Sequence, residues 1–109
     1  MADRDKVEEL RAASADGNID VVKKLLYEGV DVNSSNEHGM TALMAAVCRF
    51  KHDTVEFLVK SGADVCQKNV HGRSSVAMAD EATRKVIFKA VKELKESKKE
   101  YRKEAIQER

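Results

Sequence analysis

The sequence contains no tryptophan, and aromatic residues make up only 5% of it. The interior of the fold must therefore be built from aliphatic side chains, namely leucine, valine, isoleucine and alanine. No stretch of the chain approaches the roughly 18 consecutive apolar residues that a membrane-spanning helix needs. The first five residues are mostly charged and no apolar run follows them, so we expect no secretory signal peptide.

Cysteine is scarce, because the chain has only Cys48 and Cys66. They form no C-x-x-C pair, and two cysteines are too few for a disulfide-stabilised scaffold. We therefore expect a reduced, intracellular protein, located in the cytoplasm or in the nucleus. Cys48 follows small apolar residues on a predicted helix, which favours packing over a role as a nucleophile.

Motifs for catalysis and metal binding are missing as well. The sequence has no G-x-x-x-x-G-K-S/T, G-x-G-x-x-G or H-E-x-x-H. Ser74 and Ser75 lie close to His71, but no acidic residue accompanies them to orient a histidine base. His38 and His71 lack the close spacing of zinc ligands, and we expect both to brace loops by hydrogen bonds to nearby backbone. These absences predict a protein without catalytic residues, metal, cofactor or small-molecule substrate.

A large excess of charge of one sign is also lacking, because the formal net charge is only +1. Such a chain has no overall attraction to nucleic acid or to a membrane surface. The charges are nevertheless unevenly placed. Residues 83–109 contain ten Lys or Arg and five Glu, a net charge of +5, whereas residues 1–82 contain ten basic and fourteen acidic residues, a net charge of −4. The body of the chain is therefore mildly acidic and its C-terminal segment is basic.

What the sequence does contain is a repeat of 33 residues. His38 and Gly39 recur at this distance as His71 and Gly72. A fixed period between about 20 and 50 residues is the signature of stacked supersecondary units. Further pairs at the same spacing are Gly29 and Gly62, Asp31 and Asp64, and Val32 and Val65.

The residues within each period resemble the ankyrin repeat. The segment 36–43 (NEHGMTAL) resembles the D-x-x-G-x-T-P-L opening of that repeat, and 61–65 (SGADV) resembles its x-G-A-D-V close. A second copy of the close lies at 27–33 (YEGVDVN). The resemblance implies an all-α solenoid of about three helix-turn-helix units, with β-hairpin-like loops and a long C-terminal helix.

The resemblance divides the chain unevenly. Only the unit at 36–68 is close to complete, and degenerate capping repeats flank it at about 5–35 and 69–94. We therefore expect an ankyrin repeat domain over 1–94, followed at 95–109 by a charged C-terminal extension of the last helix. Since about three repeats are needed for a stable stack, both degenerate units should belong to the fold.

Each unit shows the pattern of two helices. Asp5 and Asp20 in the first unit, and Thr41 and Asp53 in the second, precede apolar-periodic runs and are predicted N-caps. Gly17 suits the left-handed position just past a helix end. Core-facing triplets are predicted at 22, 25 and 26, at 55, 58 and 59, and, after the period slips to 32, at 87, 90 and 91.

Four positions depart from the ankyrin pattern. Ala42 replaces the usual proline, and the whole chain has no proline. Met44 replaces the usual histidine, which leaves Thr41 to cap its helix. His52 occupies a normally apolar position. Phe50 stands where glycine is expected between two helices, so we expect either a rebuilt turn or a left-handed phenylalanine that costs about 1 kcal/mol.

The last helix has no stop signal, because no glycine follows Gly72. We predict that it runs from about residue 82 to near residue 107. One interpretation is a solvated cap, since the end of a repeat stack needs a polar outer face. The other is a helix-mediated contact, since Ile87, Leu94 and Tyr101 are spaced by seven and form a short apolar seam. The predicted polar face of the cap comprises Lys89, Lys92, Glu93, Lys95, Glu96, Lys98 and Lys99.

The resemblance also implies where a partner binds, which in ankyrin arrays is usually on the loop tips and the inner helices. Met40 and Val70 should be exposed apolar residues on adjacent loop tips. The candidate partner-binding residues are Glu37, His38, Met40 and Arg49 in the second unit and Val70, His71 and Arg73 in the third. Further positions on the same predicted face are Asp5, Val7, Ala15, Asp16, Cys48 and Glu81.

These observations predict a non-catalytic scaffold or adaptor, acting as a monomer. It would bind a partner protein through the hairpin fingertips and the concave inner-helix face. The alternative is helical assembly, or binding of an anionic partner, through the basic C-terminal helix. Nucleic-acid binding would require a cleaner basic stripe with aromatic residues, and membrane binding a strong apolar face, so the sequence favours neither.

Overall fold

The computed structural model describes the backbone of residues 2–107 and the side chains of residues 5–96. Within this range the β pairing consists of two isolated antiparallel bridges, so the predicted all-α class with hairpin-like loops is confirmed. The side chains of Lys98, Lys99 and Tyr101, which belong to the predicted cap face and seam, lie outside the described residues. The helices are α1 (Ala2–Asp16), α2 (Ile19–Tyr27), α3 (Ala42–Cys48), α4 (His52–Lys60), α5 (Ser75–Met78) and α6 (Glu81–Gln107).

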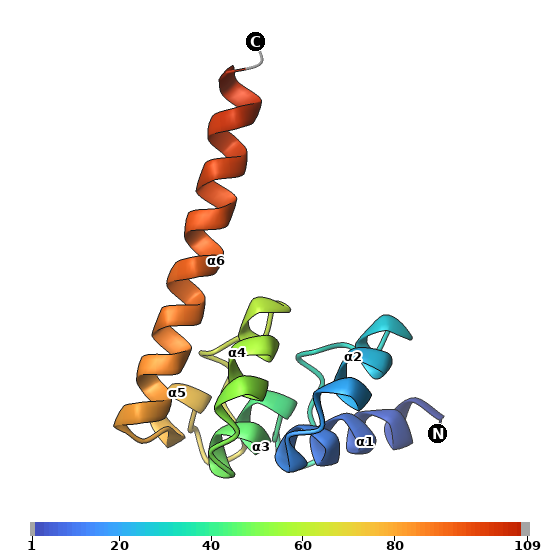
Figure 1. Ribbon diagram of the computed structural model, residues 1–109. Coiled ribbons are helices and arrows are strands. Elements are labelled where there is room, and N and C mark those ends of the chain that lie inside the picture. The colour runs from blue at the N-terminus through green and yellow to red at the C-terminus, as the bar shows by residue number, and fades with distance from the viewer. Residues whose placement is uncertain (1, 108–109) are drawn as a thin grey trace.

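The helices form two layers (Figure 1). The inner helices α1, α3 and α5 lie side by side, with α3 in contact with both of the others. The outer helices are α2, α4 and α6; α2 packs on α1, α4 packs on α3, and α6 packs on α4. Long loops connect α2 to α3 and α4 to α5, so each loop leads from one outer helix to the next inner helix. The C-terminal part of α6 extends well past the other helices (Figure 1).

Aliphatic side chains fill the space between the layers, as the lack of aromatic residues predicted. All three residues of the triplet Val55, Leu58 and Val59 are buried. Ile87 and Ala90 join the same buried cluster, which confirms that the slip of the period to 32 keeps the last helix in register with the core. The remaining triplet members are Val22 and Leu25, which are buried, and Leu26 and Val91, which are partly buried.

The predicted helix caps are only partly correct. Thr41 caps α3, because its hydroxyl oxygen accepts a hydrogen bond from the amide of Met44 at 3.2 Å. Asp20 and Asp53 are not caps: α2 and α4 begin one residue earlier, so these carboxylates lie in the first turn, where the helix dipole still favours them. Asp5 is not a cap either, because α1 begins at Ala2.

The polar residue His52 finds a partner at the junction of α4 and α6. Its Nε2 lies 3.1 Å from Oγ1 of Thr83, which is fully buried. Asp80 directly precedes α6 and accepts a hydrogen bond from the amide of Thr83 at 2.9 Å. Hydrogen bonds from the side chain and backbone of Thr83 hold the pKa of the Asp80 carboxyl below its ordinary value. The start of α6, where the third unit is one residue shorter than the second, is thus hydrogen-bonded to α4 of the second unit.

Asn33 links the first unit to the second. Its Oδ1 accepts a hydrogen bond from the amide of Asp64 at 2.7 Å, and its carbonyl oxygen accepts one from the side chain of Gln67 at 3.1 Å. The residue one period later is Cys66, whose side chain cannot reproduce an amide's paired donor and acceptor. The contact between repeats that Asn33 makes is therefore confined to the first two units.

Phe50 confirms the predicted strain at the turn between α3 and α4. Its φ of 58° places it in the left-handed region, where the equivalent residue of the first unit is Gly17 with φ 76°. The ring is 61% exposed, so burial of the ring compensates little of the backbone strain. Of the two alternatives that the sequence left open, the structure therefore shows the left-handed phenylalanine and not the rebuilt turn.

Substituting Phe50 by glycine should stabilise the protein. Glycine adopts positive φ without a Cβ clash, and the gain should exceed the extra entropy of the unfolded chain, leaving a net of about 0.5–1 kcal/mol. Urea unfolding of the purified variant measures this difference. The matched control is Phe88→Gly, an exposed phenylalanine inside α6, which should lose about 0.5 kcal/mol or more. A loss of stability in both variants would contradict the account of strain.

Candidate functional site

Two hairpin loops present most of the predicted binding residues. The loop at 35–41 is closed by the bridge between Ser35 and Thr41, and the loop at 68–74 by the bridge between Lys68 and Ser74. In each loop a glycine amide donates to the carbonyl oxygen three residues earlier, at 2.9 Å in the first loop and 3.0 Å in the second. The two loops therefore share one turn geometry, as the 33-residue period requires.

Asparagine side chains brace both loops. Oδ1 of Asn36 accepts hydrogen bonds from the amides of His38 and Met40, at 2.9 and 3.0 Å. One period later, Oδ1 of Asn69 accepts from the amides of His71 and Arg73, at 2.9 and 3.1 Å. The prediction that the histidine rings perform this bracing is therefore wrong, because a short amide side chain reaches the turn amides directly.

The two loops are also joined to each other. The amide of Val70 donates to the carbonyl oxygen of His38 at 3.0 Å. Gly39 lies against the second loop so closely that a Cβ built there would sit 2.9 Å from Cα of Asn69. The loops consequently form one connected rim, held by backbone contacts that do not depend on mobile side chains.

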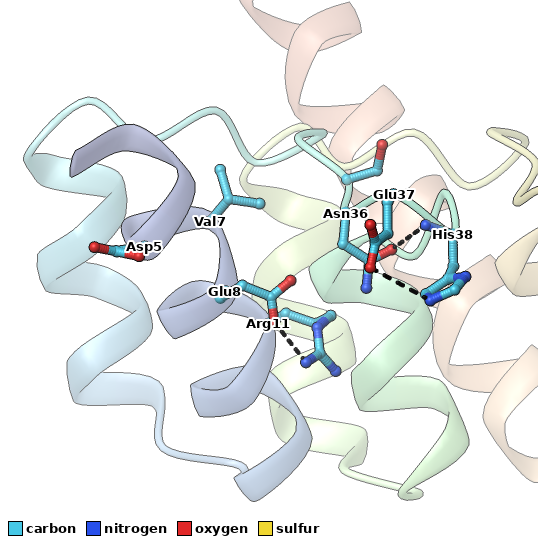
Figure 2. A pocket seen from close by; sticks show the side chains of 8 residues that line it. Asp5, Val7, Glu8, Arg11, Asn36, Glu37 and His38 are labelled. Carbon is cyan, nitrogen blue, oxygen red and sulfur yellow. Dashed lines mark hydrogen bonds and ion pairs between the residues drawn. The ribbon is translucent and has the colours of Figure 1, made fainter. Parts of the chain in front are cut away.

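A groove separates the first loop from α1 (Figure 2). Its volume is about 690 Å³. The sequence predicted four of the residues around it, namely Asp5, Val7, Glu37 and His38, but not that they line one groove. Its other lining residues are Glu8, Arg11, Ser35 and Asn36.

Arg11 is a groove residue that the sequence pattern did not predict. Its guanidinium forms an ion pair with Glu8, with 2.7 Å between Nη2 and Oε2. Its Nε is buried and has no hydrogen-bond partner among the described residues. One sequence signal pointed to this position. Arg11 lies 33 residues before Met44, and Met44 departs from the ankyrin pattern.

The other predicted residues are divided between the two ends of α3. Val70, His71 and Arg73 are exposed on the second loop, and Val70 is 60% exposed. Arg49 is also exposed, but it caps the C-terminal end of α3, about 10 Å along the helix axis from the loops. The remaining positions Ala15, Asp16 and Glu81 lie at the end of α1 and the start of α6, away from the hairpin loops.

Two expectations about exposure are wrong. Met40 is only half-exposed, because it lies against the second loop, with its Sδ 3.8 Å from Nδ2 of Asn69. The expected packing of Cys48 in the core is also wrong, because Cys48 is the last residue of α3 and is exposed. Between these two residues, every side chain of α3 from 42 to 47 is buried. The central inner helix therefore offers a partner no side chains of its own along these six positions.

Three copies of the ankyrin repeat match this chain over residues 10–104 in a scan of protein-family models. The match spans most of the chain, and the paired helices and braced loops have the arrangement that the repeat predicts. This chain belongs to the ankyrin repeat family. Ankyrin repeats are typically protein–protein interaction modules, and the family is usually non-catalytic. No curated protein sequence matches the chain.

The part of this ankyrin repeat protein that the structure describes supports neither a metal site nor a membrane-spanning helix. Among residues 5–96, no group of three or more His, Cys, Asp or Glu side chains is arranged to hold a metal ion. No helix in the range that the structure describes is both long enough and apolar enough to cross a membrane. His38 lies beside Glu37, with 3.8 Å between Nε2 and Oε1, but both side chains are highly exposed, so the pair contributes little to stability.

Proposed function

We propose that this ankyrin repeat domain is a non-catalytic scaffold that binds a partner protein, and that the groove between α1 and the first hairpin loop anchors the partner. The observation that carries the proposal is the groove itself, which draws its lining from two successive repeats. The wall formed by the first loop is preformed, because the Asn36 side chain and a loop-to-loop hydrogen bond fix it. A preformed surface keeps the ordering cost of binding low.

The charges of the groove indicate which kind of partner side chain would bind there. Asp5 and Glu37 are exposed carboxylates that line the groove from α1 and from the first loop, and the Asp5 carboxylate points away from that loop (Figure 2). Glu8 is already paired with Arg11. Lys or Arg side chains of the partner, one at each position, would complement the two exposed carboxylates.

The second loop extends this surface. Val70, His71 and Arg73 are exposed beside the first loop and would contact the partner next to its anchor. Val70 supplies apolar contact area. Met40 supplies less than a fully exposed methionine would, because it is only half-exposed. Arg49 would take part only in a partner long enough to run the length of α3.

Neutralising the two carboxylates tests this proposal. The full chain captures a partner, which is purified, and the Kd is measured by titration calorimetry. We expect the double variant Asp5→Asn with Glu37→Gln to bind about tenfold more weakly, because charge-assisted hydrogen bonds are lost. Far-UV circular dichroism checks that the variant keeps its fold.

The matched control neutralises two exposed carboxylates on the outer helices. Asp20→Asn with Asp53→Asn removes the same charge from the first turns of α2 and α4. This variant should bind the partner as tightly as the original chain. If instead the control loses affinity and the groove variant does not, the partner binds the outer helices and the proposal fails.

A further inference from the structure

The free end of the repeat stack carries an apolar side chain where a cap should be polar. Phe88 on α6 is 55% exposed. It lies with Val91, Lys92, Lys95 and Glu96 around a shallow groove of about 430 Å³. A terminal repeat has no neighbour on its outer side and normally presents polar residues there. The predicted solvated cap is therefore interrupted by a phenylalanine that the core does not need.

The repeat register shows which face of α6 this is. On α4, the residues that reach α6 are His52, through Thr83, and Lys60, whose Nζ lies 2.8 Å from Oε2 of Glu93. Glu56 lies on the same face of α4, because residues four apart share one side of a helix. Lys60 also pairs with Glu56, at 3.0 Å.

Adding the period of 32 to these positions gives the matching face of α6. His52, Glu56 and Lys60 correspond to 84, 88 and 92, that is, to Arg84, Phe88 and Lys92. This is the face on which a further outer helix would pack if the stack continued. On α4 the central position of the face is a glutamate, whereas on α6 it is a phenylalanine.

We propose that the free face of α6 around Phe88 is a second binding surface, and that its occupant is an acidic amphipathic helix of a partner protein. A helix there would continue the layer of outer helices α2, α4 and α6, and would pack on α6 as α6 packs on α4. Its apolar stripe would cover Phe88 and Val91. Its flanking carboxylates would meet Lys92 and Lys95, which Glu96 balances only in part.

Two of the three other cations of this part of α6 are already engaged, whereas the third, Lys89, is exposed near Glu93. Nε of Arg84 donates to the carbonyl oxygen of Val76 at 3.0 Å. Nζ of Lys85 lies 3.8 Å from Oε1 of Glu81. A second copy of this chain is a poorer occupant, because residues 83–109 carry a net charge of +5 and two such segments repel each other. This surface lies outside the groove of the proposed function and is independent of it.

A designed peptide tests the surface without a known partner. The probe is a fluorescently labelled helix with leucines spaced i, i+3, i+4 and i+7 and glutamates elsewhere. Its anisotropy is titrated with the full chain. A peptide of the same composition with scrambled leucine spacing, and one with lysines in place of the glutamates, are the comparison probes. We expect only the acidic amphipathic peptide to bind.

Two variants locate the binding. Phe88→Ala should weaken it by about tenfold or more, as the loss of a central aromatic anchor does. Lys92→Glu with Lys95→Glu should abolish binding of the acidic peptide and create binding of the lysine peptide, an outcome that does not depend on Phe88. Lys24→Glu, an exposed lysine of α2, and the groove variant Asp5→Asn with Glu37→Gln should leave peptide binding unchanged.

Three outcomes would overturn the proposal. The first is equal binding of the scrambled acidic peptide, which would mean unspecific attraction to the basic helix. The second is binding that is indifferent to both α6 variants. The third is concentration-dependent dimerisation in sedimentation velocity that Phe88→Ala abolishes, which would make a second copy the occupant.

Discussion

Replacing Ile87 by alanine should lower the free energy of unfolding by about 2–5 kcal/mol, the usual range for truncating a buried aliphatic side chain. Ile87 is fully buried in the common core, although the 33-residue period fails at its position. For a small domain with a total stability of roughly 5–15 kcal/mol, this is a large share. Urea unfolding followed by circular dichroism measures the change.

The neighbouring residue provides the control for this substitution. Phe88→Ala removes a larger side chain one position further along α6, but from the surface. We expect a change within about 0.5 kcal/mol, as for surface positions generally. If the two variants lost stability equally, the register of α6 against α4 would be wrong, and with it the face assigned to Phe88.

Replacing Gly39 by alanine should destabilise the protein by about 2–3 kcal/mol and weaken partner binding together with it. Gly39 has a φ of 74°, so any Cβ is strained there. The added methyl would also press on the backbone of Asn69 and Val70, at 2.9 and 3.0 Å, and backbone cannot move aside as a side chain can. The substitution should therefore push the two hairpin loops apart.

Gly72→Ala separates these two effects. Gly72 has nearly the same φ, 75°, but nothing lies within 4 Å of a Cβ built there. This variant should lose only the left-handed strain, about 1–2 kcal/mol. Equal losses for Gly39→Ala and Gly72→Ala, measured by urea unfolding, would show that the contact between the loops contributes nothing.

The repeat architecture could be predicted well from the sequence, because the same residue types recur wherever the same packing contact or turn recurs. Glycine recurs where the backbone must turn left-handed, and the apolar triplets recur where helices meet, so Val55 and Ile87 could be assigned to the core from the residue pattern alone. The long α6 was predicted from the absence of a glycine after Gly72 and ends where expected. The assignment of residues 1–94 and 95–109 to a domain and an extension stays a prediction.

The exact starts of helices, and features that depend on contacts between repeats, were predicted less well. The N-caps at Asp20 and Asp53 were misplaced because an acidic residue is favourable both at the cap and in the first turn, and the sequence does not distinguish the two. Met40 was expected to be exposed because its half-burial comes from Asn69, a residue of the next loop.

The sequence predicted individual residues of the proposed binding surface, but not how they lie together. Glu37 and His38 were recognised as loop-tip residues, whereas their position opposite α1 depends on how the first unit stacks. Arg49 was assigned to the concave inner-helix face, and repeat position alone does not show at which end of α3 the partner lies. Cys48 and the buried residues of α3 likewise show that the central inner helix contributes mainly to stability.

The most direct test of the central claim is site-specific photocrosslinking to the purified partner. A benzophenone amino acid is placed at position 37 on the rim of the groove, or at position 24 on the exposed surface of α2. The proposed function predicts that position 37 crosslinks to the partner and position 24 does not. Efficient crosslinking from position 24 with none from position 37 would contradict it, because the partner would then lie on the outer helices.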